Sequence, residues 1–169
     1  IQVIKQFVVA PQILSGQRSF PAVVQAHKRA DLSFGVPGKV TEIYFKEGVD
    51  AKRGQVIARL DNSDFLNVLN DRKANYKRAK ADLERSTEML SKGFISKTEH
   101  ERLKAQLASE EAALNQAQLN LEYTEIKAPF DGTLSRRYIE RFEEVQAKQM
   151  VFNFADTSAL VLIVDIKNV

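Results

Sequence analysis

The chain has 169 residues, of which 44% are hydrophobic and 28% are charged, and this balance is typical of a globular protein rather than a disordered one. The 25 basic and 22 acidic residues leave a net charge of +3, which is too small to indicate a nucleic-acid-binding protein. The absence of Cys excludes disulfides, thiolate metal sites and Cys nucleophiles.

Hydrophobic alternation predicts short strands in the first third of the chain. Residues 32–36 and 56–60 alternate in this way, and the longest apolar run, Ala159–Val164, also has the length of a strand. That run is far shorter than the ~18 apolar residues of a membrane-spanning helix. Short strands separated by tight turns predict a small β sandwich or barrel. The turn signals are Pro37-Gly38, Glu47-Gly48, Arg53-Gly54 and Asp131-Gly132.

The stretch from Asn62 to Lys127 contains no Pro and a single Gly, Gly93, near its middle. Good helix formers dominate it, so we predict two helices joined by one tight turn. Apolar residues spaced alternately by three and four predict a coiled-coil seam, with arms of roughly 28 residues or ~42 Å folded back antiparallel. The predicted seam positions are Leu69, Arg72, Tyr76, Ala79, Leu83, Ser86 and Leu90 on the first arm and Leu103, Leu107, Glu110, Leu114, Ala117 and Leu121 on the second.

The predicted turn carries signals that end one helix and begin the next. Gly93 suits the left-handed position that follows a helix, and Ser96 with Glu99 forms a capping box for the second arm. The alternative is an ordinary globular helix pair. The narrow seams and charged outer surfaces favour a hairpin that projects from another domain.

The segments on either side of the hairpin resemble each other at an offset of about 94 residues. This predicts one pseudo-symmetric β unit, split at Asp61/Asn62 and rejoined near Tyr123, with a chance match as the alternative. Gly48 and Gly54 correspond to Phe142 and Lys148, so we expect different turn geometry in the second half or a local failure of the offset. The matched pairs include Gly38 with Gly132, Val40 with Leu134, Tyr44 with Tyr138, Gln55 with Gln149, and Leu60 with Phe154.

Segments 38–43, 47–57 and 126–134, together with the hairpin, resemble the periplasmic adaptors, or membrane fusion proteins, of tripartite efflux pumps. The most specific part is Lys127-Ala-Pro-Phe-Asp-Gly132, and the resemblance runs from about Arg18 to Ile166. It implies an α+β fold: a lipoyl-like β sandwich in two halves, an inserted antiparallel coiled-coil hairpin and part of a β barrel. The implied division is 1–30 for barrel strands, 31–61 for the first half, 62–122 for the hairpin, 123–156 for the second half and 157–169 for the return into the barrel.

The resemblance implies a structural, non-enzymatic role in the periplasm of a Gram-negative bacterium, in association with the inner membrane. The expected partners are an inner-membrane transporter, an outer-membrane channel and further copies of the chain in a ring. Arms of this length resemble adaptors of resistance-nodulation-division transporters. Two Met and two His do not indicate copper efflux. No cofactor and no nucleic acid are implied. The chain opens without Met or a signal peptide, so we expect a mature or excised fragment.

Members of this family carry a tip pattern of Arg, Leu four residues on and Ser seven further. The matching residues are Arg85, Met89 with its neighbour Leu90, and Ser96. We predict that they dock the tip into grooves between helices of the channel. In the alternative, Ser96 only caps the helix and Met89 and Leu90 only close the seam.

The other polar features carry weaker hypotheses. A basic run of Arg72, Lys73, Lys77, Arg78 and Lys80 is interpreted as a solvated face that pairs with Glu110, Glu111 and Glu122 across the hairpin. His27 and His100 lack the spacing of a metal site, and His100 is expected to pack against Ile95.

Two other functions stay open at this stage. One is a coiled-coil interaction module unrelated to efflux, and the other is a lipoyl or biotinyl carrier with Lys127 as its modified residue. No catalytic set converges in the sequence.

Overall fold

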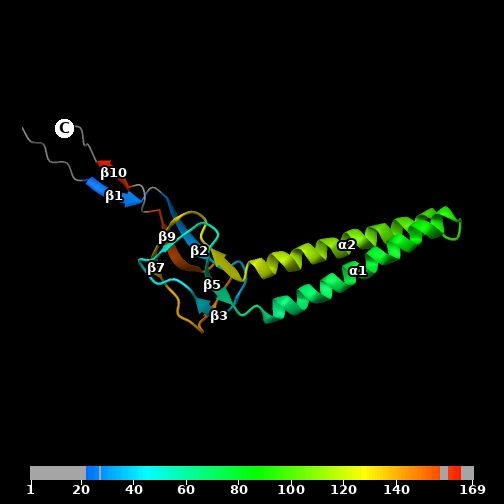
Figure 1. Cartoon of the computed structure of the whole chain (residues 1–169), viewed down its shortest axis with the longest axis horizontal. Coiled ribbons are helices and arrows are strands. Elements are labelled where there is room, and N and C mark those ends of the chain that lie inside the picture. The colour runs from blue at the N-terminus through cyan, green and yellow to red at the C-terminus, as the bar shows by residue number, and fades with distance from the viewer. Residues whose placement is uncertain (1–21, 27, 157–159, 165–169) are drawn as a thin grey trace, which may run out of the picture.

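The computed structural model of the chain describes residues 22–26, 28–156 and 160–164. Two long helices form a hairpin that extends from a small β sandwich, and β1 and β10 lie at the other end of that sandwich (Figure 1). The strands are β1 (Ala22–Ala26), β2 (Arg29–Ser33), β3 (Gly38–Ile43), β4 (Asp50–Ala51), β5 (Val56–Leu60), β6 (Glu125–Lys127), β7 (Gly132–Arg137), β8 (Glu144–Val145), β9 (Met150–Ala155) and β10 (Leu160–Val164), and the helices are α1 (Ser63–Ser91) and α2 (Lys97–Glu122).

The sandwich consists of two four-stranded antiparallel sheets, ordered β2-β9-β7-β4 and β6-β5-β3-β8. An offset of about 94 residues converts each strand of one sheet into the strand at the same place in the other. Val40 pairs with Leu60 as Leu134 pairs with Phe154, and both ladders have an irregularity just after this pair. The predicted internal duplication is therefore confirmed at the level of strand register.

The backbone hydrogen bonds between the halves are duplicated as well. The Gly48 N–H donates to the Leu134 carbonyl and the Phe142 N–H donates to the Val40 carbonyl, both at 2.8 Å. In the same way, the Gly54 N–H donates to Ala128 and the Lys148 N–H donates to Phe34, again both at 2.8 Å. Each half thus closes its turns on a strand or loop of the other half.

These bonds explain where the sequence-based expectation for the second half was wrong. Phe142 and Lys148 have φ angles of 72° and 63°, close to the 81° and 84° of Gly48 and Gly54. The offset holds and the turn geometry is the same, so residues with a Cβ occupy left-handed backbone. The cross-half hydrogen bonds fix the path of the chain there despite the steric cost.

The hydrophobic core lies inside the sandwich. Its largest fully buried side chains come from both halves and from both sheets, and none comes from the hairpin. The hairpin can therefore depart from the sandwich without leaving the core open. The largest of these core residues are Phe34, Phe152, Phe154, Ile57, Leu60, Leu134 and Ile139.

The helices α1 and α2 have 29 and 26 residues. At 1.5 Å per residue they extend about 43 and 39 Å. Ala79, Ser86 and Ala117 are the buried members of the predicted seam, and most of the others are half-buried. Arg72 is exposed, so its assignment to the seam was wrong. Its charged head stays in water while its stem can lie along the helix.

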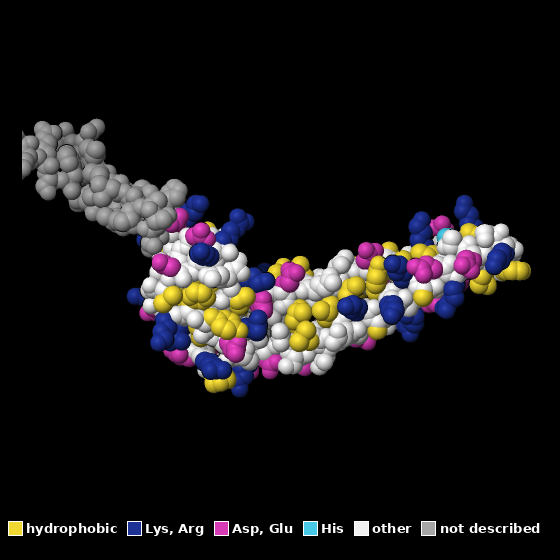
Figure 2. Space-filling model, in the orientation of Figure 1, with side chains coloured by type: hydrophobic (Ala, Val, Ile, Leu, Met, Phe, Trp, Pro, Cys, Tyr) yellow, Lys and Arg dark blue, Asp and Glu magenta, His cyan; other side chains and the backbone are white. Residues whose placement is uncertain are grey.

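The expected ion pairs across the hairpin are absent from the part of the chain that the structure describes. The ion pairs there lie within one helix or within the sandwich, and none joins α1 to α2. Figure 2 shows charged side chains of both signs along the outside of the hairpin. Neither described helix has the length and hydropathy that crossing a membrane requires.

Candidate functional site: the tip of the hairpin

The first helix ends in a Schellman motif. Lys92 is the C-cap residue of α1, and the next residue, Gly93, has a φ angle of 73°. The Gly93 N–H donates to the Leu90 carbonyl at 3.0 Å, and the Phe94 N–H donates to the Met89 carbonyl at 2.9 Å. This pair of bonds satisfies carbonyls that the end of the helix would leave open, and it fixes the turn. The predicted left-handed role of Gly93 is confirmed.

The second helix begins at Ser96, whose Oγ accepts a hydrogen bond from the Glu99 N–H at 3.1 Å. The capping half of the predicted box is therefore confirmed. The Glu99 carboxylate instead binds Arg102, with distances of 2.7 and 2.9 Å to the guanidinium nitrogens. This hydrogen bonding by Arg102 lowers the pKa of Glu99. Arg102 offers a charged donor, which explains why the carboxylate turns toward it.

The structure places the four predicted tip residues in the last two turns of α1 and at the start of α2. Arg85 is exposed and forms an ion pair with Asp82 on its own helix. Met89 is 43% exposed, whereas Leu90 is half-buried toward the seam. Arg85, Met89 and Ser96 are thus accessible to a partner, while Leu90 supports the helix pair. Their role in docking stays a prediction.

The sequence analysis missed Phe94, which is 73% exposed and more exposed than any other large hydrophobic side chain among the described residues. Hydrophobic side chains gather at the far end of the hairpin in Figure 2. A signal was present in the sequence: Phe94 lies between the helix-ending glycine and the capping serine, where no seam position exists.

A second missed feature joins the two arms near the tip. The Ser86 Oγ lies 2.9 Å from His100 Nδ1, and the same hydroxyl donates to the Leu83 carbonyl at 2.7 Å. Ser86 is 3% exposed. The expectation that His100 packs against Ile95 missed this polar contact, because periodicity identifies a face of the helix and not the partner across it.

An ion pair joins the two strands of the sandwich that lie next to the base of the hairpin. Arg59 on β5 binds Glu125 on β6 at 2.6 Å, and hydrogen bonding by this carboxylate raises the pKa of the guanidinium. Lys127 lies in β6, opposite Val56, with its amine 3.4 Å from Glu125. A lysine in a strand and beside a carboxylate does not have the exposed turn position that a carrier lysine needs.

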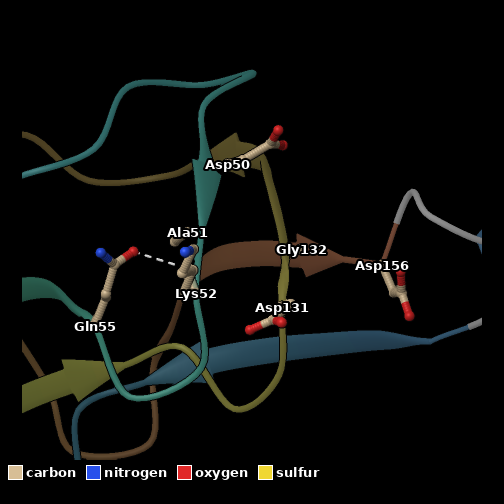
Figure 3. Close-up of a pocket in the computed structure, with 7 residues that line it drawn as sticks. All are labelled: Asp50, Ala51, Lys52, Gln55, Asp131, Gly132 and Asp156. Carbon is tan, nitrogen blue, oxygen red and sulfur yellow. Dashed lines mark hydrogen bonds between the residues drawn. The ribbon is translucent and has the colours of Figure 1, made fainter.

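The sandwich has an open pocket of about 540 Å³ (Figure 3). Figure 3 shows that Asp50, Asp131 and Asp156 come from different segments around it. Asp131 accepts the Arg53 N–H at 2.7 Å and Asp50 accepts the Thr133 hydroxyl at 2.5 Å, so these carboxylates already serve turns. The described residues contain no group of three or more His, Cys, Asp or Glu with the arrangement of a metal site.

This pocket has a counterpart under the 94-residue offset. Pro37, Gly38 and Glu144 line the second pocket, and they correspond to Asp131, Gly132 and Asp50 of the first. The start of α1, through Asp64 and its neighbours, lines the counterpart as well. The two pockets therefore mark equivalent ends of the sandwich, one of which carries the hairpin. No convergent chemistry appears in either, so the tip is the candidate site.

The duplicated sandwich with an inserted helical hairpin defines the class of protein. Residues 28–156 match the model of the CzcB-like barrel-sandwich hybrid domain, and the chain belongs to this family. The α+β fold, with its sandwich and inserted hairpin, and the resemblance to periplasmic adaptors are confirmed. The predicted barrel strands at 1–30 and 157–169 fall largely outside the described residues and stay a prediction.

Two curated relatives are efflux components. The chain is 29% identical over 128 residues to the antibiotic efflux pump periplasmic linker protein ArpA of Pseudomonas putida, covering 76% of this chain and 34% of that protein. It is 26% identical over 125 residues to the multidrug resistance protein MexA of Pseudomonas aeruginosa, covering 74% of this chain and 33% of that protein. The chain thus spans about a third of the length of these relatives.

Two solved structures of efflux components have a similar fold. A putative efflux transporter from Bacteroides eggerthii superposes with a TM-score of 0.78 at 29% identity, covering 85% of this chain and 44% of that chain. A MacA-MexA chimera that contains the Pseudomonas aeruginosa MexA α-hairpin domain gives a TM-score of 0.79 at 25% identity, covering 89% of this chain and 57% of that chain.

Proposed function

We propose that this chain is the hairpin-bearing part of a periplasmic adaptor that links an inner-membrane efflux transporter to an outer-membrane channel. One observation carries the proposal: a capped helical hairpin about 43 Å long extends from the sandwich on the side away from β1 and β10 (Figure 1). A part with this shape can hold two partners apart at a fixed spacing. The relatives that are named as efflux-pump linkers support this use.

In this function the transporter supplies the energy and the chain supplies geometry. The ion pair between Arg59 and Glu125 joins the two strands next to which the helices leave the sandwich. Copies side by side in a ring would present several tips to one channel, and weak contacts at single tips would then sum. The transporter expected from the hairpin length is of the resistance-nodulation-division type, and the exported molecules are small.

Site-specific crosslinking tests the proposal. These 169 residues contain no Cys, so after replacement of any Cys elsewhere in the full-length protein one introduced thiol reports one position. Ser91→Cys places a thiol on the last residue of α1, at the tip, and Glu122→Cys places one on the last residue of α2, at the base. Both residues are exposed. The full-length protein carrying Ser91→Cys should crosslink to the outer-membrane channel in membranes, and Glu122→Cys should not.

Equal crosslinking at the two positions, or none at either, would contradict the proposal. Arg85→Ala in the Ser91→Cys background should lower the yield, because Arg85 is exposed on the last turns of α1. Ser96→Asn is the corresponding variant at Ser96. Asn keeps the helix cap but changes the side chain that a partner would contact.

A further inference from the structure

The tip carries an exposed apolar pair that the family pattern does not include as a unit. Phe94 is 73% exposed and Met89 is 43% exposed, and the 2.9 Å bond from the Phe94 N–H to the Met89 carbonyl ties the two backbones together. Among the described large hydrophobic side chains, the next most exposed is Phe142, at 60%, on the sandwich. An aromatic side chain of this size buries ~150–250 Å² when it enters a pocket.

This exposure occurs on a fixed turn rather than on a loose one. The Schellman bonds hold Gly93 and Phe94 from one side, and the Ser96 cap holds α2 from the other. A partner would therefore meet a side chain whose backbone is already ordered, and binding would cost less conformational entropy than it would at a flexible loop.

The charges around Phe94 indicate the chemistry of the surface it fits. Lys92 and Lys97 lie two residues before it and three after it, both are exposed, and neither has an ion pair in the described part of the chain. Arg85 and Arg102 are engaged by Asp82 and Glu99. The unpaired acids Glu88 and Glu101 lie about one turn further back on each helix, so the segment 92–97 that holds Phe94 carries two positive charges and no negative one.

We propose that Phe94 is the residue that anchors the hairpin in an apolar pocket of the outer-membrane channel, and that an acidic rim of this pocket faces Lys92 and Lys97. This anchor role depends on the adaptor function proposed above, and it specifies the chemistry of the contact between the hairpin tip and the channel. A single aromatic on a narrow tip is suited to a pocket, because central buried aromatics dominate protein interfaces. Binding to a lipid surface uses a wide apolar face along a helix, which this tip does not offer.

The test measures the affinity of the full-length protein for the purified channel in detergent. Phe94→Ala should weaken binding by about tenfold or more, whereas Phe94→Leu should stay within about threefold, because Leu still fills an apolar pocket. Tyr138→Ala is the matched control, since Tyr138 is an aromatic on the sandwich with 46% exposure and should leave the affinity unchanged. Lys92→Glu combined with Lys97→Glu should weaken binding and reduce its dependence on salt.

The outcomes separate this proposal from the proposed function. If Phe94→Ala binds the channel like the wild type while Ser91→Cys still crosslinks to it, the anchor role is overturned and the adaptor function stands. If the wild type neither binds nor crosslinks to the channel, the proposed function itself fails.

Two further measurements identify other occupants of the tip. Loss of co-sedimentation of Phe94→Ala with vesicles of phosphatidylethanolamine and phosphatidylglycerol, at unchanged channel affinity, would assign Phe94 to a membrane and overturn the proposal. Dissociation of the protein into smaller species by Phe94→Ala in sedimentation velocity, again at unchanged channel affinity, would assign it to contact between copies, with the same consequence.

Discussion

Phe142 and Lys148 hold a left-handed backbone at the two places where the first half of the sandwich has glycine. The cross-half hydrogen bonds impose this geometry, and a side chain makes it costly by ~1–2 kcal/mol. At Phe142 a cation–π contact offsets part of this cost, because the Arg141 guanidinium lies 4.8 Å from the centre of the ring. Lys148 is exposed and shows no comparable contact among the described residues.

Lys148→Gly should therefore stabilise the chain. Removing the Cβ relieves the strain, and the greater freedom of glycine in the unfolded chain offsets part of the gain, which leaves about 0.5–1 kcal/mol in the free energy of unfolding. Urea denaturation measures it. Lys148→Ala is the control and should change stability little, because it keeps the Cβ. A loss of stability in Lys148→Gly would show that the left-handed turn is not strained.

Gly132 and Gly38 occupy equivalent positions in the two halves but have different surroundings. A Cβ on Gly132 would lie 2.5 Å from the backbone oxygen of Ala155, whereas one on Gly38 would meet Leu60 Cδ1 at 3.3 Å. Gly132→Ala should thus cost about 2–3 kcal/mol, because backbone must move, and Gly38→Ala less than about 1 kcal/mol, because a side chain can yield. Equal losses of stability in the two variants would contradict the asymmetry.

At the residue scale, the sequence predicts where the turns lie but not every residue that adopts a positive φ in them. Glycine at 48 and 54 indicates positive φ, and the same φ at Phe142 and Lys148 leaves no trace in composition. Tertiary hydrogen bonds decide these two positions. Phe94 was missed because the sequence analysis judged exposure from periodicity, whereas the signal for Phe94 is its place in the loop between Gly93 and Ser96.

The helices begin and end where local chemistry directs them. Asp61 follows β5 and accepts hydrogen bonds from the Ser63 hydroxyl at 2.7 Å and the Ser63 N–H at 3.0 Å, so it stabilises the first turn of α1. These hydrogen bonds, the hydroxyl first, lower the pKa of Asp61. A carboxylate at the start of a helix is also favoured by the helix dipole.

This lowered pKa predicts how the contribution of Asp61 depends on pH. Because the folded-state pKa lies below the unfolded value of 3.8, the stabilisation is present above that value and is lost as the pH falls through the folded-state pKa. Asp61→Ala should therefore be less stable than the wild type at pH 7, and the difference should shrink below pH ~4. Thermal unfolding at several pH values measures it, and a constant difference from pH 7 to pH 3 would contradict the role.

The heptad pattern predicted both arms and most of the seam, since burial in a helix pair follows a simple repeat. It did not predict the contact between Ser86 and His100, nor the absence of ion pairs between the arms in the described part of the chain. A heptad repeat shows which face of a helix is buried, whereas pairing between polar side chains depends on their conformers and on competition with water.

At the scale of the whole molecule, the sandwich and hairpin have separate tasks. The core is formed by the two halves of the sandwich, and the hairpin has only its own seam. Internal duplication made this architecture predictable, because two similar segments on either side of a helical stretch indicate an insertion. Which partner meets the tip depends on a surface outside this chain, so sequence periodicity carries no information about it.

The central claim is that the hairpin acts as a rigid spacer of defined length. Deleting residues 69–75 from α1 and 111–117 from α2 removes one heptad from each arm, so the seam stays in register and the tip, with its Arg85–Asp82 ion pair, remains intact. The tip then retreats by about 10 Å. A control variant replaces these two segments with other heptads of the same length.

The decisive measurement is crosslinking of Ser91→Cys to the channel, in membranes, by the full-length protein with the shortened hairpin. We expect the yield to fall at least about tenfold with the shortened hairpin and to return with the length-matched control, since a rigid arm cannot make up the ~10 Å. Undiminished crosslinking by the shortened protein would contradict the account, because it would show that the reach of the hairpin does not set the distance between the two membranes' components.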